Sequence, residues 1–428
     1  MRSPLRALAA PIYIPSLIYS IGNGALQPVV VLAALDIGFS DAGASAVLGV
    51  AGVVGVFTAP LIGRVITKLG DRRSLIFASI LALAALGLSL SALFYPDTAY
   101  ATASFMSGIS LIAISLNVWM LARQAYIADA LPGMWRGRGL STLGGMLRLG
   151  VLIGPLLSTA LIALWGLESI FLMNAVTVSI ALALIVRYLV PLPSRQNPPK
   201  QEGSEQRADR RHRRDAHPGG VPRPDLRATI ITGFGVTTLT ILRSNKNVII
   251  PLWGASLGLE NEIITLAFAA SALIDTIMFY PGGRLSDRMG RMWGLVPSLT
   301  IMSSAIILMV LWADPLGYFL SSALLGFGNG LGSGILMTLG ADLSPSTNRA
   351  NFLGYWQAIS SSGMAAGPFI ASALTAGIGI SAALWATAGL GLFGALWFRT
   401  LLPGTYRRLG LDLRGMPLQT DINTLENK

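Results

Sequence analysis

Long apolar runs, separated by short charged or Pro- and Gly-rich breaks, follow one another along most of this chain. Each run reaches roughly 20 residues, the length that an α-helix needs to cross a bilayer core about 30 Å thick. Segments inside a bilayer must satisfy their own backbone hydrogen bonds, and no series of short alternating strands is visible, so the runs predict helices. The predicted helices cover residues 10–34, 43–66, 74–95, 100–128, 139–164, 167–191, 228–253, 261–283, 292–313, 315–342, 350–377 and 380–402.

The twelve predicted helices fall into two sets of six, joined by a polar segment. We therefore expect an all-helical membrane protein with a first half at 1–191, a linker at 192–227, a second half at 228–402 and a tail at 403–428. The linker concentrates Arg, Pro and Gly with both histidines, a composition that cannot bury a core. We expect it to be a disordered, solvated tether, with a regulatory or lipid-binding role as the alternative.

Two sequence patterns occur twice. The segment Gly283 to Arg291 reads Gly-Arg-Leu-Ser-Asp-Arg-Met-Gly-Arg, and a partial copy begins at Gly63, 220 positions earlier. Such duplication is typical of transporters built from two related halves. A second set recurs with a shift of 213 positions, with Asp129, Pro132, Arg136, Gly150, Gly154 and Pro155 matching Asp342, Pro345, Arg349, Gly363, Gly367 and Pro368.

The composition supports a membrane protein and excludes several kinds of site. Hydrophobic residues make up 53% of the chain, charged residues only 12%, and the mean hydropathy is +0.63. These values are far too apolar for a soluble globular protein. The chain has no cysteine, which excludes disulfides, a thiolate nucleophile and cysteine-based metal sites. We expect the apolar run near the N-terminus to be retained as the first helix rather than cleaved as a signal peptide.

Basic residues are distributed unevenly, although the net charge of +11 alone could suggest nucleic-acid binding. The basic residues outside the helices lie on one predicted side, which the positive-inside rule identifies as the cytoplasm. We expect a multi-pass protein of the plasma or inner membrane with both termini in the cytoplasm, and contact of the basic side with anionic lipid rather than nucleic acid. The connections on the opposite side, near 36–42, 96–99, 165–168, 254–262, 313–315 and 377–380, contain no Lys or Arg.

Charged residues inside predicted helices are costly, so each marks a wet cavity or a partner. They are Arg123, Arg148, Arg243, Lys246 and Asp275. Arg243 and Lys246 share a helix face at a spacing of three. Asp275 is the one deep carboxylate and the candidate proton carrier, with a structural ion pair to Arg243 as the alternative. The excess of positive charge favours an anionic or amphipathic substrate.

Residues 10–402 resemble the major facilitator superfamily, because they combine six plus six helices with the motif Gly-x-Leu-x-Asp-Arg-x-Gly-Arg between the eighth and ninth helices. In that family the motif belongs to a cytoplasmic gate. The resemblance implies that Gly283 permits close helix packing and that Asp287 lies against a helix N-terminus. Arg288 and Arg291 would join a cytoplasmic salt-bridge cluster. The alternative is a basic loop that only sets the topology.

The first copy of this motif departs from the family pattern, since Thr67 stands where Asp is usual and Asp71 is the alternative carboxylate. The primary gate of the first half is therefore expected to be weakened or rewired. The expected pairs are Asp129 with Arg72 or Arg73, and Asp342 with Arg288 or Arg291. The complete predicted gate comprises Gly63, Asp71, Arg72, Asp129, Gly283, Asp287, Arg288, Arg291 and Asp342.

A Gly-x-x-x-Gly-Pro pattern at Gly150, Gly154 and Pro155 resembles a family motif associated with export, with Ser158 where a further glycine is usual. Its physical content is a face of small residues that allows close packing, followed by a proline bend. Generic helix packing is the alternative interpretation. The pattern recurs at Gly363, Gly367 and Pro368.

The resemblance implies a central cavity lined by the first, fourth, seventh and tenth helices. Tyr19, Asn23 and Gln27 recur at intervals of four along the first helix, which suggests a face turned to water. For the Asn and Gln side chains, hydrogen bonding between helices is the alternative. The cavity candidates are Tyr19, Asn23, Gln27, Asn117, Arg123, Arg243, Lys246 and Asn329, and Trp119 and Gln124 extend the set.

These observations predict a secondary transporter that works by alternating access. Proton-coupled efflux of a small organic compound is the first expectation, based on the Gly-Pro pattern, and transport of an anionic metabolite is the alternative, based on the core arginines. An enzyme and a channel are disfavoured, whereas a non-transporting sensor on the same fold stays open. We expect no metal and no cofactor, protons and a small-molecule substrate as partners, and a monomer.

Overall fold

The computed structural model describes residues 4–191, 225–345, 349–416 and 418. Most of the predicted linker, 192–227, therefore lies outside the described residues, and so does the tail after residue 418. The expectations of a disordered linker and a cytoplasmic tail are consequently untested for these parts of the chain.

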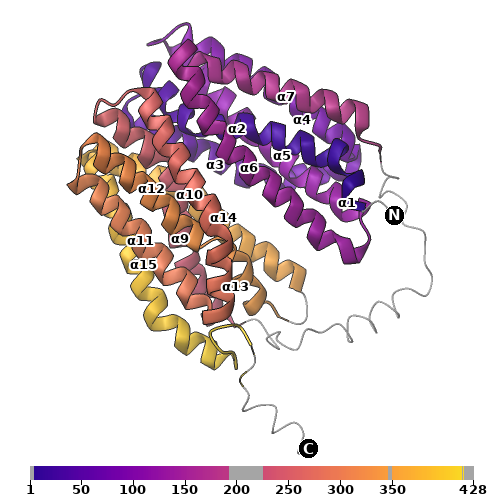
Figure 1. The fold of residues 1–428 in the computed structure, drawn as a ribbon, viewed down its shortest axis with the longest axis vertical. Coiled ribbons are helices and arrows are strands. Elements are labelled where there is room, and N and C mark those ends of the chain that lie inside the picture. Colours follow the sequence, from indigo (N-terminus) through magenta and orange to yellow (C-terminus); the bar gives the residue numbers. More distant parts are fainter. Residues whose placement is uncertain (1–3, 192–224, 346–348, 417, 419–428) are drawn as a thin grey trace, which may run out of the picture. The chain divides into compact units, whose positions relative to one another are not determined.

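The first half of the described chain consists of helices that match the six predicted apolar runs (Figure 1). Several begin at a polar cap: the Ser40 and Thr98 hydroxyls accept hydrogen bonds from backbone N–H groups three residues later. The elements are α1 (Pro4–Ala7), η1 (Ala9–Tyr13), α2 (Ile14–Asp36), α3 (Asp41–Leu69), α4 (Asp71–Leu93), α5 (Ala99–Ala130), α6 (Gly133–Trp165) and α7 (Glu168–Tyr188).

The second half is also helical, but one predicted helix is interrupted. Residues 315–342 were expected to form one helix, whereas a break at 332–334 divides them, with Gly334 at a positive φ of 82°. The run Gly330-Leu331-Gly332-Ser333-Gly334 explains the break, because glycine tolerates this backbone conformation. The elements are α9 (Leu226–Ser256), α10 (Asn261–Met289), α11 (Arg291–Leu311), α12 (Pro315–Leu331), α13 (Ile335–Leu343), α14 (Arg349–Ile378) and α15 (Ile380–Arg408).

The basic motifs expected to be loops are mostly helical. Helix α10 continues through Met289 and α3 through Leu69, and only Gly70 and Gly290 interrupt the helices, with φ values of 81° and 106°. The polar ends therefore extend the helices beyond their apolar parts, where charged side chains can lie outside the hydrocarbon core.

Ten helical segments among the described residues are long and apolar enough to cross a membrane. The two predicted spans outside this set are α9 and α14, with 31 and 30 residues. At about 1.5 Å per residue both exceed a bilayer core of about 30 Å. Their lower hydropathy reflects polar content such as Arg243 and Lys246 in α9. The all-helical membrane fold with two related halves is confirmed.

The chain divides into two compact units. Unit 1 contains residues 1–196, 247–272 and 368–383, and unit 2 contains the rest, so α9, α10, α14 and α15 each contribute to both. In unit 1, α2 packs against α6 and α7, and α4 packs against α5 and α7 (Figure 1). In unit 2, α11 packs against α12 and α13.

Candidate functional site

The polar cluster of unit 2 centres on Asp275, which lies midway along α10, 14 residues from either end. Its Oδ2 accepts a hydrogen bond from Nδ2 of Asn329 on α12 at 2.8 Å. The backbone carbonyl of Asn329 in turn accepts one from Nη2 of Arg243 on α9 at 3.5 Å. Asn329 therefore bridges the two charged side chains, and the structural ion pair between Arg243 and Asp275 stays an alternative.

The break after α12 explains why Asn329 can hold this position. The N–H of Ser333 bonds to Gly330 O, at 3.1 Å, so it tightens the last turn and leaves the carbonyl of Asn329 without its usual helical donor. Side chains supply the donors: Ser333 Oγ at 3.3 Å and Arg243 Nη2. Side-chain donors of this kind can replace the missing backbone hydrogen bonds of a membrane helix that is interrupted where water is absent.

Close backbone packing brings α12 onto α10 at this point. A Cβ atom added to Gly330 would lie 2.7 Å from the carbonyl oxygen of Asp275, and one added to Gly282 would lie 2.6 Å from that of Leu331. Only glycine permits this approach, which carries Asn329 to the carboxylate. By contrast, a Cβ added to Gly283 or Gly63 would meet no atom within 4 Å. Gly282 makes the close packing within unit 2, and the packing expected at Gly283 stays a prediction.

The cluster retains unused hydrogen-bonding capacity. Oδ1 of Asp275 and Oδ1 of Asn329 are buried and have no hydrogen-bond partner among the described residues. A buried acceptor without a donor is costly, more so when it is charged. A proton on the carboxylate, or a donor group on a solute, would remove that cost.

Unit 1 contains a second buried polar group, on α5 and α2. The rings of Tyr19 and Trp119 stack with centroids 4.1 Å apart. Trp119 donates from Nε1 to Ser79 Oγ at 3.2 Å, and the hydroxyls of Tyr19 and Ser115 lie 3.1 Å apart. These hydrogen bonds fix both rings. Tyr19, Trp119 and Arg123 are almost completely buried, with exposures of 1%, 1% and 2%.

Arg123 lies one helical turn after Trp119 on α5. Its Nη2 is 3.7 Å from the sulfur of Met120, while Nε and Nη1 have no hydrogen-bond partner among the described residues. A buried guanidinium with unused donors is an unusual arrangement, because charges are normally paired in apolar surroundings. These donors suit a carboxylate or another anionic group.

The other predicted cavity residues lie in different environments. Asn23 donates from Nδ2 to the Tyr19 carbonyl at 2.9 Å, within its own helix, so it does not bond between helices in this structure. Gln27 and Asn117 are half-buried, and Lys246 is 7% exposed. The amide nitrogen of Asn117 lies at the contact with α3, 2.8 Å from where a Cβ on Gly55 would be. Arg148 is half-buried on α6.

The predicted gate of the second half contains a charged cluster. Arg291 donates from Nε and Nη2 to the two carboxylate oxygens of Asp342, at 2.8 and 3.3 Å, and from Nη1 to Asp287 at 3.0 Å. The hydroxyl of Tyr406 donates to Asp342 at 3.0 Å. Arg291 and Asp342 side chains are 10% and 11% exposed, but Asp287 is 70% exposed. The two-pronged Arg291–Asp342 pair is therefore the principal interaction.

The other predicted gate residues make different contacts in the described part of the chain. Arg288 forms no ion pair among the described residues, and Asp342 pairs with Arg291. Arg72 donates to the carbonyl of Val186 at 2.8 Å, and the expected pairing of Asp129 with Arg72 or Arg73 stays a prediction. Thr67, which replaces the usual Asp, bonds to Gly63 O within its own helix. Among these arginines, Arg291 therefore bonds to carboxylates and Arg72 to a backbone carbonyl.

The Gly-Pro pattern marks a helix crossing in each half. A Cβ on Gly154 of α6 would lie 2.5 Å from the carbonyl of Ile21 on α2, and one on Gly150 would lie 2.7 Å from the carbonyl carbon of Ser20. Ser158 donates to the Ala25 carbonyl at 3.0 Å, which adds a hydrogen bond to the same crossing. The repeat on α14 contacts α9, where Cβ atoms on Gly363 and Gly367 would lie 2.7 Å from Thr237 O and 2.8 Å from Asn245 Oδ1.

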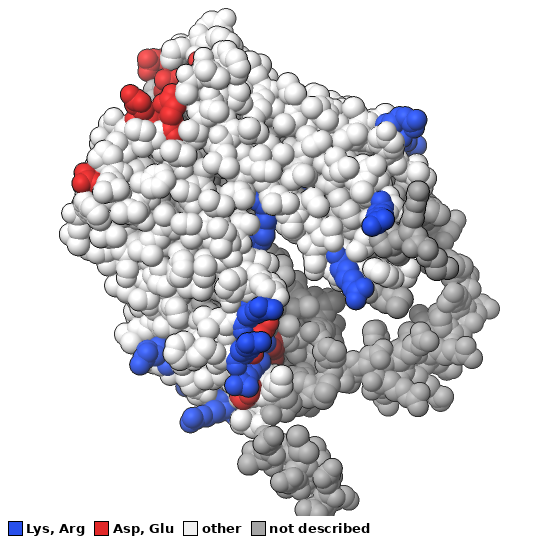
Figure 2. Space-filling view, in the orientation of Figure 1, with Lys and Arg blue, Asp and Glu red and all other residues white. Residues whose placement is uncertain are grey.

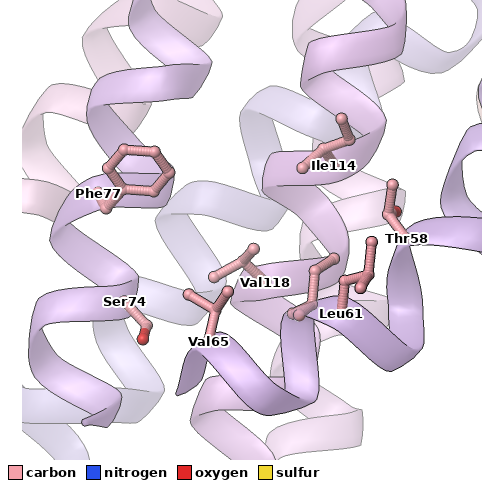
Figure 3. Close-up of a pocket in the computed structure, with 8 residues that line it drawn as sticks. Thr58, Leu61, Val65, Ser74, Phe77, Ile114 and Val118 are labelled. Atoms are coloured by element: carbon pink, nitrogen blue, oxygen red, sulfur yellow. The ribbon is translucent and has the colours of Figure 1, made fainter. Parts of the chain in front are cut away.

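An apolar pocket of about 180 Å³ opens between α3, α4 and α5 in unit 1 (Figure 3). Leu61, Val65 and Phe77 point toward it from two helices, with Ile114 and Val118 on the third side. Its lining carries no charged group and none of the predicted cavity residues. This pocket therefore does not bring the polar candidates together.

Acidic side chains collect at one set of helix ends. On the face that Figure 2 shows, most of them form a patch without Lys or Arg. In unit 1, α3 begins with Asp41 and α7 with Glu168, while Arg187 lies in the last turn of α7 and Lys68 in the last turn of α3. This arrangement agrees with the uneven charge distribution in the sequence.

Comparison with known proteins shows the family. The model of the Major Facilitator Superfamily matches residues 12–246 and 232–414. A search of curated proteins finds no match. The matched residues include both polar clusters and both copies of the gate motif.

Solved structures with the same fold have low sequence identity to this chain. A D-xylose–proton symporter is 17% identical, with a TM-score of 0.69 over 97% of this chain and 99% of that one. A POT family transporter in complex with a thioalcohol-conjugated peptide is 10% identical, with a TM-score of 0.73 over 94% and 96%. The human organic anion transporter MFSD10 (TETRAN) is 17% identical, with a TM-score of 0.60 over 92% and 100%.

These structural likenesses establish the fold, and the family model covers almost all of the helical chain in two overlapping matches. Two sets of membrane helices, a repeated gate motif and buried charged clusters all agree with that match. The chain belongs to the major facilitator superfamily and is a transporter by family and fold.

Proposed function

We propose that this transporter couples movement of a small organic solute to protons by alternating access, and that it works in the direction of export. The observation that carries the coupling is the Asp275 carboxylate in the middle of α10. One of its oxygens accepts from Asn329, and the other has no hydrogen-bond donor among the described residues.

Protonation of Asp275 would change the cluster in a defined way. The ionised carboxylate accepts from Asn329, whose backbone carbonyl accepts from Arg243. A proton on Oδ1 neutralises the group, and the new O–H becomes a donor that can bond to a solute. Loss of the negative charge also weakens its attraction for Arg243. Protonation at one face and release at the other would then tie solute movement to proton movement.

The gate cluster supports alternation rather than a permanently open pore. Arg291, Asp342 and Tyr406 form a bonded group that can be made and broken as a unit. The Gly-Pro pattern at α6 supports the export direction by resemblance to the family motif. We also propose a monomer in the plasma or inner membrane with both termini in the cytoplasm, supported by the one-sided distribution of basic residues.

A second candidate function is transport of an anionic metabolite. It is favoured by Arg123, whose Nε and Nη1 are buried without hydrogen-bond partners in the described part of the chain. A carboxylate that reached this position would accept from Nε or from Nη1 and lie beside the Tyr19 and Trp119 rings. Because Arg123 is 2% exposed, the solute could reach it only after a conformational change.

The test of proton coupling uses purified protein in liposomes that contain a fluorescent pH indicator. Carboxylates, dipeptides, sugars and hydrophobic cations are added separately with and without a pH gradient. At least one class should exchange across the membrane and move protons. Asp275→Asn should reduce the proton movement to the background of empty liposomes while solute exchange without a gradient continues, because the amide cannot carry a proton.

Asp41→Asn is the matched control, since it makes the same chemical change at an exposed helix start. It should behave as wild type. Gradient-driven uptake that survives Asp275→Asn would exclude this residue as the carrier. Wild-type protein that moves none of the solutes would contradict transport and favour a sensor on the same fold.

A further inference from the structure

The segment that follows the last helix contacts the gate. We propose that residues 409–416, here named the C-terminal strap, are a component of the gate and position Arg291 and Asp342. The inference rests on the alternating access proposed above, but its test measures the gate directly and requires no knowledge of the solute.

The strap begins with a helix end that turns the chain back. Gly410 has a φ of 71°, its N–H bonds to Arg407 O at 3.1 Å, and the N–H of Leu411 bonds to Tyr406 O at 2.9 Å. This is a Schellman motif, in which a glycine in the left-handed conformation ends a helix. Leu411 is 4% exposed and therefore anchors the turn in the protein.

Asp412 closes the rest of the strap into a compact turn. Its Oδ1 accepts from the N–H groups of Arg414 and Met416, at 2.9 and 2.8 Å, and its own N–H bonds to Met416 O at 2.7 Å. Asp side chains stabilise turns in this way by bonding to the backbone that follows. The strap is therefore a defined structure rather than an extended tail.

Two contacts place this turn on the gate. The N–H of Arg291, at the first position of α11, donates to Leu413 O at 2.6 Å. Helix starts lack intrahelical acceptors for their first N–H groups, so the strap supplies one here. A Cβ on Gly290 would lie 2.8 Å from Leu413 O, and one on Gly415 would lie 2.6 Å from Asp342 Oδ1. Both glycines permit direct approach of the strap to the gate.

Tyr406 links the strap to the charged pair. It is 1% exposed at the end of α15, and its hydroxyl donates to the same oxygen of Asp342 that accepts from Arg291 Nε. The carboxylate is thus held by Arg291 and Tyr406, while the backbone of Arg291 is held by the strap. Movement of the end of α15 would loosen both partners at once, which makes the strap and Tyr406 positioning elements.

Because the sequence contains no cysteine, a single introduced cysteine is the only thiol, and its labelling rate reports how accessible the gate is. Ser286 suits this purpose, since it is 5% exposed and lies on α10 against α11 beneath the gate. In Ser286→Cys protein, labelling by a bulky maleimide should be slow. Adding Tyr406→Phe, or deleting residues 409–428, should increase the labelling rate about tenfold, as expected for loss of a charge-assisted hydrogen bond.

Tyr355→Phe is the matched control, since this tyrosine is 74% exposed on α14, and it should leave the labelling rate unchanged. Tyr406→Phe should have no further effect in an Asp342→Asn background, because its hydroxyl acts through that carboxylate. Size-exclusion profiles identify variants that fail to fold. If the deletion fails, Asp412→Ala, which removes the carboxylate that closes the strap, should raise the labelling rate in the same direction, and an unchanged rate would overturn the role of the strap. Equal labelling in wild type and Tyr406→Phe, or additive effects in the double variant, would overturn the proposal. Loss of proton movement in Asp275→Asn is independent of this outcome.

Discussion

Two buried charged side chains, Arg123 and Asp275, have polar atoms without a hydrogen-bond partner among the described residues. Arg123 has two buried nitrogens without hydrogen-bond partners among the described residues, and Asp275 has one such oxygen. Burying such groups is costly, so we propose that each one binds a partner in another step of the proposed transport cycle. For Asp275 we propose a proton, and for Arg123 an anionic solute group.

A charge-removing substitution tests the role of Arg123. In Arg123→Gln protein, the apparent affinity for aromatic carboxylates should fall about 10- to 100-fold, because hydrogen bonds to charged groups contribute about 1.5–3 kcal/mol. The corresponding neutral amides should bind wild type and variant alike. Ligand-dependent thermal shifts in detergent measure both. Arg187→Gln, at the end of α7, is the control. Unchanged discrimination between carboxylates and amides would contradict the anionic candidate.

At the scale of elements, backbone contact between helices determines where side chains can meet. Gly330 and Gly282 bring α12 onto α10, and Gly154 brings α6 onto α2. In a membrane, where apolar side chains gain little by leaving lipid, such close packing is a principal source of helix association. The break after α12 adds polar bonding at the point of contact, through the carbonyl of Asn329.

Two glycines of α6 provide a matched comparison of this packing. Gly154→Ala should lower the free energy of unfolding by about 1–3 kcal/mol, because the added methyl group would overlap the backbone of α2. Gly145→Ala, where nothing lies within 4 Å of the added atom, should be neutral or slightly stabilising. Thermal unfolding in detergent, followed by tryptophan fluorescence, compares them. Equal melting temperatures would contradict the assignment of the packing face.

At the scale of the whole molecule, the sequence repeat is accompanied by different interactions in its two copies. The second gate motif uses the Arg291–Asp342 pair, and in the first Arg72 bonds to a carbonyl. In the second half, Arg408 at the end of α15 also donates to Asp225, just before α9, at 2.7 Å. The two copies of the motif therefore differ in the acceptor that these arginines use.

The Asp225 contact predicts a pH effect on stability. The N–H of Ala228 donates to this carboxylate, at 2.9 Å, and with Arg408 it holds the pKa of Asp225 below its usual range. The ionised carboxylate therefore stabilises the fold at pH values above the pKa that Asp225 has in the unfolded chain. This stabilisation is lost as the pH falls through the lower pKa of Asp225 in the folded protein. Asp225→Ala should cost about 1 kcal/mol near neutral pH, mainly through loss of the helix cap.

Asp225→Asn separates the charge from the cap, because asparagine caps helices about as well as aspartate. Its deficit should be smaller, about 0.2–1 kcal/mol as for exposed ion pairs, and should shrink in acid as the wild-type carboxylate becomes neutral. Melting temperatures measured from neutral to acidic pH test this expectation. A deficit that stayed constant across the whole range would contradict it.

The sequence by itself determined the helical membrane class and the duplication, and it limited the expected partner of Asp342 to Arg288 or Arg291. A spanning helix is predicted from about 20 apolar positions together, so one polar residue among them does not change the prediction. The same redundancy explains why helix ends were less well predicted: α10 continues through its basic motif until Gly290 stops it. Turn residues in the tail, Gly410 and Asp412, could have indicated the strap but not the surface that it contacts.

Only the tertiary structure decided which polar side chains meet. It brought Asn329 into hydrogen-bond contact with Asp275 and Arg243, placed Gly282 at a close backbone contact, and placed Tyr406 on Asp342. Successive residues of an α-helix point about 100° apart, since about 3.6 residues complete a turn. A shift of one position or a small rotation therefore changes every partner, and the apolar pattern that fixes the helix does not fix its rotation against its neighbours.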